Sequence, residues 1–203
     1  TCRYGKYFIY SHAICDHQHN SRYNLCEIRP TNPAGLMIYF ITGFTGVGKT
    51  TIGRELASLT NLTFIDLDET IEVKINQTIA SYFEEYGEEA FRDIERQTLI
   101  ESITLHSDGI IALGGGTLSY RLNHVNILQS GTLIYLELPW AELYLRIKKL
   151  KNRPTLKDKT EAQIKAIFNQ RLPFYELSQL KMPINSGFST QKLVDILKLS
   201  TNR

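Results

Sequence analysis

Short runs of consecutive apolar residues recur along this chain, and longer segments with helically spaced apolar residues separate them. A continuous apolar run of roughly four to eight residues is typical of a strand that is buried on both faces. We expect four such strands, at residues 37–42, 62–67, 109–113 and 132–138, and a short extended segment at 182–185. Strands of this kind form parallel sheets that are covered by helices on both faces.

Helices are expected between these runs. In residues 50–59, Ile52, Leu56 and Leu59 recur on one helical face, and Asn61 provides a stop signal. Further helices are expected at 69–105, in two or three segments with a break at Tyr86-Gly87, and at 119–129, 139–150, 161–178 and 190–199. Alternating strands and helices imply right-handed crossovers. The fold class is therefore α/β, a three-layer sandwich, in which ligands bind beyond the carboxyl ends of the strands.

Residues 1–36 differ in composition from the rest of the chain. They hold all three cysteines (Cys2, Cys15 and Cys26), and residues 29–35 are dense in turn and linker residues. An odd number of cysteines confined to one end argues against a disulfide framework and fits a reducing compartment, so we expect a cytoplasmic protein. We expect 1–36 to be a poorly ordered and dispensable leader, and 37–203 to form the functional domain.

Two other interpretations of residues 1–36 stay open. Basic residues outnumber acidic ones there, as in a mitochondrial or plastid presequence, although serine is sparse and no amphipathic helix is evident. Four side chains that can bind zinc also lie close together in the sequence, but their spacing matches no standard zinc finger. These four are Cys15, His17, His19 and Cys26.

Hydropathy and charge exclude two classes of protein. No apolar run approaches the ~18–20 residues that cross a bilayer. The net charge of +2 arises in residues 1–36, so residues 37–203 are neutral and lack the basic field of a general nucleic-acid binder. We therefore expect neither a membrane nor a nucleic acid as partner. We expect a monomer that acts on a small molecule.

The first strand leads into a motif for binding nucleotide phosphates. Residues 43–50 read GFTGVGKT, a full match to G-x(4)-G-K-[ST]. In this motif the backbone N–H groups of a glycine-rich loop and the start of the next helix face the phosphates, a lysine bridges the outer phosphates, and a hydroxyl binds Mg²⁺. A Rossmann loop is excluded because Thr51 stands where a third glycine is needed. The predicted nucleoside triphosphate site comprises Gly46, Val47, Gly48, Lys49, Thr50 and Thr51.

The surrounding motifs narrow the type of nucleotide-binding protein. A guanine-specific GTPase would carry an N-K-x-D segment, and this sequence has none. A motor or helicase usually has a long apolar strand that ends in Asp-Glu, whereas the strand at 109–113 is followed by glycines. A small-molecule kinase fits better, provided that the chain also supplies an acceptor site. A nucleotide-binding regulator without turnover stays an alternative.

Two carboxylates follow the second predicted strand. Asp66 and Asp68 have i, i+2 spacing, so on an extended backbone they project to the same side. Carboxylates at this edge can hold a magnesium-bound water and accept a proton from a substrate hydroxyl. The alternative is that they cap the helix that begins nearby.

Arginines and glycines supply the rest of a candidate acceptor site. Arg92 and Glu95 lie on one helical face, so Glu95 can orient the guanidinium for a bidentate contact with a carboxylate; the alternative is a surface ion pair. The run 114–116 is Gly-Gly-Gly, which permits close approach of the backbone to a ligand, or forms a loose turn. Arg153, in the polar stretch 151–160, could cover the transferring phosphoryl group. Arg171 is a further candidate residue of the acceptor site. Each of the two could instead be a solvated surface arginine.

Six sequence segments in this order resemble the shikimate kinases, over essentially all of residues 37–203. The segments are GFTGVGKTTIGRELA, FIDLDETIE, FEEYGEEAFRDIE, ALGGGT, NRPTL and RLPFY. The resemblance implies a five-stranded parallel sheet of the nucleoside monophosphate kinase type. It also implies transfer of the γ-phosphoryl group of ATP to the 3-hydroxyl of shikimate, in the biosynthesis of chorismate and the aromatic amino acids.

The resemblance also implies roles for individual residues. Asp68 would bind the acceptor hydroxyl and act as general base, with Asp66 near the Mg²⁺. Shikimate would be held by Arg92, Gly114, Gly115, Gly116 and Arg171, within an acceptor-binding region at about 68–101. Arg153 would belong to a lid at about 151–160, and Arg146 would lie beside the adenine.

Two features depart from the family pattern, and one alternative substrate class remains. The segment 1–36 is not part of the family core, and residues 185–189 (NSGFS) lack an arginine that some relatives have there. Gluconate-type sugar-acid kinases also need a few cations around a small carboxylate-bearing acceptor, so they are the alternative enzyme class.

Overall fold

The computed structural model describes residues 37–150, 156 and 159–199. Five strands form one parallel sheet in the order β2-β3-β1-β4-β5. The strands are β1 (Ile38–Thr42), β2 (Phe64–Asp66), β3 (Gly109–Ala112), β4 (Gly131–Glu137) and β5 (Leu180–Pro183). The helices are α1 (Lys49–Thr60), α2 (Leu67–Ile75), α3 (Ile79–Leu105), α4 (Asn123–Ser130), α5 (Trp140–Ile147), α6 (Glu161–Tyr175) and α7 (Thr190–Leu197), with a 3-10 helix η1 (Thr117–Ser119).

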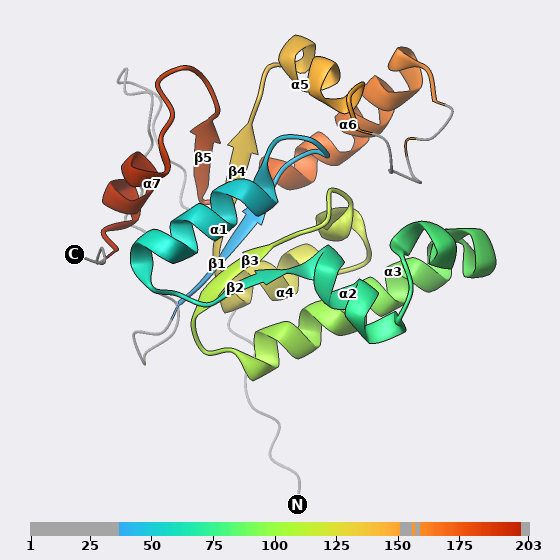
Figure 1. Ribbon diagram of the computed structural model, residues 1–203, viewed down its shortest axis with the longest axis horizontal. Coiled ribbons are helices and arrows are strands. Elements are labelled where there is room, and N and C mark those ends of the chain that lie inside the picture. The colour runs from blue at the N-terminus through green and yellow to red at the C-terminus, as the bar shows by residue number, and fades with distance from the viewer. Residues whose placement is uncertain (1–36, 151–155, 157–158, 200–203) are drawn as a thin grey trace, which may run out of the picture.

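The helices lie on both faces of the sheet, which confirms the three-layer α/β prediction (Figure 1). Helices α1 and α7 pack together on one face, and α4 packs on β4 from the other. In the register of the central strands, Phe40 of β1 is paired with Ile111 of β3 and Leu133 of β4, and all three are buried. A strand enclosed in this way is largely apolar on both faces, which explains the apolar runs in the sequence.

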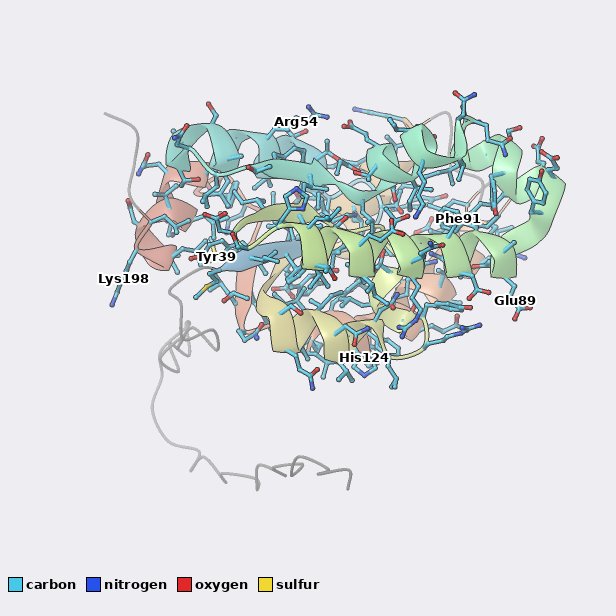
Figure 2. The ribbon with its side chains drawn as sticks, turned by 90° about the horizontal axis from the view of Figure 1, so that it is seen from below. Tyr39, Arg54, Glu89, Phe91, His124 and Lys198 are labelled. Atoms are coloured by element: carbon cyan, nitrogen blue, oxygen red, sulfur yellow. The ribbon has the colours of Figure 1, made fainter. Side chains whose placement is uncertain are left out.

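Side chains fill the space between the sheet and its helical layers (Figure 2). Helix α3 illustrates the pattern: Phe91 turns inward and is buried, whereas Glu89, just after the kink at Gly87, is exposed and points outward. None of the helices among the described residues has the length and apolar character that a bilayer span requires.

The boundaries differ from the sequence predictions at two places that concern the site. The second strand ends at Asp66, so Leu67 and Asp68 already belong to α2. The helix expected at 119–129 is divided into η1 and α4. The break expected at Tyr86-Gly87 is present as a kink within α3, where Gly87 has non-helical angles (φ 81°, ψ 175°). Asn61, in the left-handed conformation, ends α1 as expected.

Candidate active site

The loop between β1 and α1 adopts the geometry that its glycines permit. Gly48 precedes the helix with φ 108° and ψ 22°, in a region that side chains disfavour. In the described part of the chain, no side chain caps the first turn of α1, and this turn holds no acidic residue. The first N–H groups of α1 and its positive dipole end are therefore available to an anion.

Lys49 is the first residue of α1, and its ammonium group folds back over the loop. Nζ donates to the carbonyl oxygens of Gly43 at 2.9 Å and of Phe44 at 3.3 Å. Weak carbonyl partners at the mouth of the loop hold the charge close to where outer phosphates would bind. Arg146, in the last turn of α5, donates to the carbonyl oxygen of Val47 at 3.3 Å, so it also borders this loop.

Asp66 connects the loop with the second strand. One carboxylate oxygen accepts a hydrogen bond of 2.6 Å from the Thr50 hydroxyl. The other accepts from the backbone N–H groups of Asp68 at 3.0 Å and Glu69 at 3.4 Å, so that Asp66 caps α2. The capping alternative therefore holds for Asp66, and the same carboxylate also contacts the phosphate-binding loop.

The expected reason for the position of Asp68 is wrong. Asp66 and Asp68 do not share an extended backbone, because Asp68 lies in the first helical turn of α2. Both side chains nevertheless face one pocket. The helical turn, set by the Asp66 cap, brings the second carboxylate round to the same cavity.

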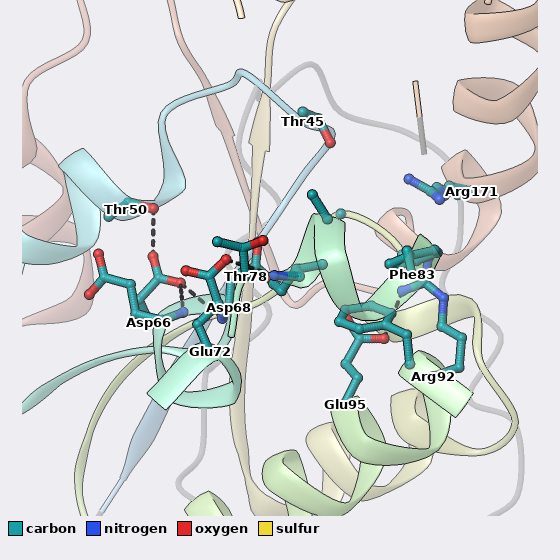
Figure 3. A pocket seen from close by; sticks show the side chains of 17 residues that line it. Thr45, Thr50, Asp66, Asp68, Glu72, Thr78, Phe83, Arg92, Glu95 and Arg171 are labelled. Carbon is teal, nitrogen blue, oxygen red and sulfur yellow. Dashed lines mark hydrogen bonds and ion pairs between the residues drawn. The ribbon is translucent and has the colours of Figure 1, made fainter. Parts of the chain in front are cut away.

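This pocket has a volume of about 480 Å³ and combines opposite charges at its two ends (Figure 3). Asp66, Asp68 and Glu72 lie at one end, beside Thr50 of the phosphate-binding loop. Arg92 and Arg171 lie at the other. Gly114, Gly115 and Gly116, which follow β3, also line the cavity. The structure therefore brings Asp68, Arg92 and Arg171 into one cavity next to the phosphate-binding loop.

The guanidinium of Arg92 is paired with a buried carboxylate, and the pair does not lie at the surface. Its Nη1 donates to Glu95 Oε2 at 2.7 Å, and Arg92 and Glu95 are only 8% and 1% exposed. Nη2 also reaches the exposed Glu88 at 3.3 Å. Burial acts to lower the pKa of the Arg92 guanidinium, but the charge and hydrogen bond of Glu95 outweigh it and raise this pKa above its ordinary value. The surface ion pair that the sequence left open is thus excluded.

Arg171 approaches from α6, and its guanidinium lies over the Phe44 ring, 5.6 Å from the centroid. Burial lowers the pKa of Arg171 below its ordinary value, and the like charge of Arg92 acts in the same direction. Arginine remains protonated at neutral pH even so. Two partly desolvated guanidiniums that repel each other form a site that a carboxylate ligand would stabilise.

The glycines that follow β3 make room for these side chains. A Cβ at Gly114 would lie 2.6 Å from Glu95 Oε1, and a Cβ at Gly116 would lie 2.7 Å from Arg92 Nη2. The Gly115 carbonyl accepts a hydrogen bond of 2.5 Å from the Tyr175 hydroxyl, which holds the loop against α6. A loose turn is therefore the wrong interpretation of 114–116.

The sequence did not predict some of the residues that form the pocket. Thr45 of the phosphate-binding loop, Phe83 of α3 and Tyr175 of α6 line or support the cavity. Tyr175 stood in a quoted segment, RLPFY, but nothing local assigns its hydroxyl to a carbonyl sixty residues away. Thr45 occupies a variable position of the loop motif, so the motif carries no signal for it.

Several predictions fall outside this geometry. Thr51 is exposed in the first turn of α1 and, like Lys49, does not line this pocket, so its role in binding the nucleotide stays a prediction. Arg153 and most of the predicted lid lie outside the described residues, as do the possible zinc ligands in 1–36. The described residues contain no cluster of three or more side chains of the types that ligate zinc.

A phosphate-binding loop at the carboxyl edge of a parallel sheet, beside a pocket with acidic and basic ends, defines a nucleotide-dependent kinase of small molecules. A family model described as "Shikimate kinase" matches residues 45–198. The chain is 36% identical over 162 residues to the shikimate kinase of Parabacteroides distasonis, covering 77% of this chain and 93% of the relative. It therefore belongs to the shikimate kinase family.

Solved structures agree with this assignment. The shikimate kinase of Acinetobacter baumannii in complex with shikimate has a TM-score of 0.75 at 32% identity, covering 81% of this chain and 94% of the other. The shikimate kinase of Bacteroides thetaiotaomicron has a TM-score of 0.73 at 30% identity, covering 80% and 99%. These matches confirm the five-stranded P-loop kinase fold that the sequence resemblance implied.

Proposed function

We propose that this chain transfers the γ-phosphoryl group of ATP to the 3-hydroxyl of shikimate, giving shikimate 3-phosphate and ADP, a step of chorismate and aromatic amino-acid biosynthesis. The observation that carries the proposal is the charge separation within one pocket, with carboxylates beside the phosphate-binding loop and two arginines opposite. Shikimate has a carboxylate at one end and hydroxyl groups at the other, so it complements both ends. The relative from Acinetobacter baumannii, which was solved with shikimate, supports the same substrate.

The geometry divides the work of phosphoryl transfer among the residues. Arg92 and Arg171 would bind the acceptor carboxylate, and the glycine loop would approach the ring. Asp68 would then accept the proton of the reacting hydroxyl as it attacks the γ-phosphorus, while Lys49 and the first turn of α1 stabilise charge on the phosphates. Such a reaction depends on alignment and electrostatics more than on covalent help.

Thr50 and Asp66 form a set of oxygen donors suited to Mg²⁺. Their side-chain oxygens are 2.6 Å apart at the edge of the phosphate site, and Mg²⁺ prefers such hard oxygen ligands, often with waters and substrate phosphates. We propose that these two residues hold the ion, Asp66 directly or through water. When bound, Mg²⁺ would neutralise charge on the phosphate oxygens.

The proposed function is tested by a coupled ADP-release assay on the full chain with ATP and Mg²⁺. Three reactions are compared: with shikimate, with gluconate and without acceptor. Rapid ADP release only with shikimate supports the proposal. Turnover with gluconate instead would assign a sugar-acid kinase, and binding of ATP without turnover in any reaction would assign a regulator.

The Arg171→Lys variant is expected to raise the KM for shikimate roughly tenfold or more, with little change in the KM for ATP. Lysine keeps the charge but loses the planar fork that makes two parallel hydrogen bonds, and a hydrogen bond to a charged group contributes about 1.5–3 kcal/mol. Steady-state kinetics with each substrate varied measures both constants. Arg121→Lys, which changes an exposed arginine paired with Asp93, is the matched control. A rise confined to the KM for ATP would reassign Arg171 to the nucleotide.

We further propose that residues 37–203 form the kinase domain, with an acceptor-binding region at about 68–101 that includes Asp68 and Arg92. The pocket-lining residues all lie within 45–171 of one chain, so a second copy is not needed to build the site, and we propose a monomer. A cytoplasmic location remains a proposal from the cysteine pattern.

A chain that begins at Met37 is expected to keep its kcat and both KM values, because the family match covers residues 45–198. The ADP-release assay and the thermal unfolding midpoint of the two forms check this. Lost activity in the shorter chain would show that residues 1–36 contribute to the enzyme.

A further inference from the structure

The carboxylate of Glu95 has a partner on each oxygen. Oε2 accepts from Arg92, and Oε1 accepts a hydrogen bond of 2.6 Å from the hydroxyl of Thr117. Thr117 is the first residue of η1, directly after the glycine loop, and it is fully buried. The orientation of Glu95 is therefore set by two elements, since Arg92 lies on α3 and Thr117 follows β3.

Thr117 is itself fixed by a second buried residue. The amide nitrogen of Asn123, which is 0% exposed, donates to the Thr117 carbonyl oxygen at 2.9 Å. The amide oxygen of Asn123 accepts from Arg96 at 2.9 Å. A continuous set of hydrogen bonds thus runs from Arg96 through Asn123, Thr117 and Glu95 to Arg92.

The Thr117 hydroxyl matters because Glu95 has so little contact with solvent. A buried carboxylate that loses a hydrogen-bond donor is left with an unsatisfied oxygen, which favours its rotation toward another donor. Such a movement would turn the guanidinium of Arg92, because the two groups share a short charge-assisted bond. Glycine at 114 leaves room for this arrangement, since a Cβ there would lie 2.9 Å from the Thr117 hydroxyl oxygen.

We propose that Thr117 is a positioning residue for the acceptor carboxylate: its hydroxyl fixes Glu95, and Glu95 aims the guanidinium of Arg92 into the pocket. The inference rests on the proposed function and deepens it, because it explains how one of the two carboxylate-binding arginines is oriented. It predicts that the hydroxyl at position 117 affects the binding of a charged acceptor and leaves the nucleotide site unchanged.

The test compares two pairs of side chains that differ mainly in the hydroxyl: threonine against valine, and serine against alanine. Thr117→Val is expected to raise the KM for shikimate roughly tenfold, the scale of a lost hydrogen bond to a charged group, with the KM for ATP and kcat nearly unchanged. Thr117→Ser should restore most of the affinity, and Thr117→Ala should lose it. The Ser and Ala pair decides the question if the valine variant does not fold.

Thr98→Val is the matched control. Thr98 is also buried, at 1% exposure, and lies one turn beyond Glu95 on α3. Its hydroxyl has no hydrogen-bond partner among the described residues, so the same substitution there removes no hydrogen bond. The KM for shikimate should stay at its wild-type value.

The methyl ester of shikimate separates positioning from general damage to the fold. Because the ester lacks the negative charge that Arg92 would bind, the Thr117→Val variant and the wild type should handle it with similar KM values. An equal loss for shikimate and its ester, or a parallel rise in the KM for ATP, would overturn the inference. So would a failure of the serine variant to restore affinity.

Calorimetric titration of shikimate without ATP distinguishes failure of this inference from failure of the proposed function. If the wild type neither binds nor phosphorylates shikimate, the proposed function is wrong and the inference is overturned with it. If the wild type binds shikimate and the valine and alanine variants bind it equally well, only the role of Thr117 is wrong.

Discussion

Replacing Asp68 by asparagine is expected to lower kcat by roughly 10²–10⁴, the usual contribution of a positioned general base. Asparagine preserves the size and shape of the side chain but cannot accept the proton of the attacking hydroxyl. Asp68 lies where α2 begins, between the Thr50 end of the pocket and the glycine loop, and a Cβ at Gly114 would lie 3.0 Å from its Oδ1. The loss should therefore appear in the chemical step.

Single-turnover kinetics with saturating ATP and shikimate measures this step directly. Asp108→Asn is the control, because Asp108 is exposed and precedes β3, at the opposite edge of the sheet from the pocket. Unchanged turnover in Asp68→Asn would remove the proposed role. A large rise in the KM for shikimate at normal kcat would make Asp68 a binding residue instead.

Much of the fold could be predicted because its signals are local. Most residues of β1, β3 and β4 are apolar and buried, since helices cover both faces of these strands. The phosphate-binding loop is a contiguous motif, and Asn61 and Gly87 mark a helix end and a kink through their own backbone preferences. Each of these features depends on residues adjacent in the sequence.

The end of β2 could not be predicted in this way. Leu67 extends an apolar run and is fully buried, which suits either a strand or the first turn of a helix. The helical turn forms at Leu67 because the carboxylate of Asp66 caps α2. The same carboxylate accepts a hydrogen bond from Thr50. That second bond joins segments distant in the sequence, so no local pattern contains it.

The candidate site also combines features that have a local sequence signal with features that have none. Residue types and motif order were enough to select Asp68, Arg92 and Arg171 as neighbours, and the structure places them in one cavity. The sequence indicated only part of the reason for the glycine run. The run also accommodates Glu95 and Arg92, whose approach depends on how α3 packs against η1. The bond from Thr117 to Glu95 has no counterpart in any local pattern and required coordinates.

The Lys49→Met variant is expected to lose about 2.7–4 kcal/mol of transition-state stabilisation, the scale of a lost preorganised electrostatic donor, or roughly 10²–10³ in kcat/KM. Methionine retains an unbranched side chain of similar length and removes the ammonium group. In the structure this group donates to the Gly43 and Phe44 carbonyl oxygens, which hold it at the mouth of the loop.

The charge of Lys49, rather than its packing, should carry this loss, because the triphosphate brings negative charge to the mouth of the loop. Lys74→Met on α2 is the matched control: it removes an ammonium group paired with Glu101 at the surface, where an ion pair contributes only about 0–1 kcal/mol. Its kcat/KM should match the wild type, and both variants should unfold near the wild-type temperature. The readout is kcat/KM for ATP at saturating shikimate. A near-normal value for Lys49→Met would contradict the prediction. It would mean that the backbone N–H groups and the helix dipole stabilise the developing charge without the lysine.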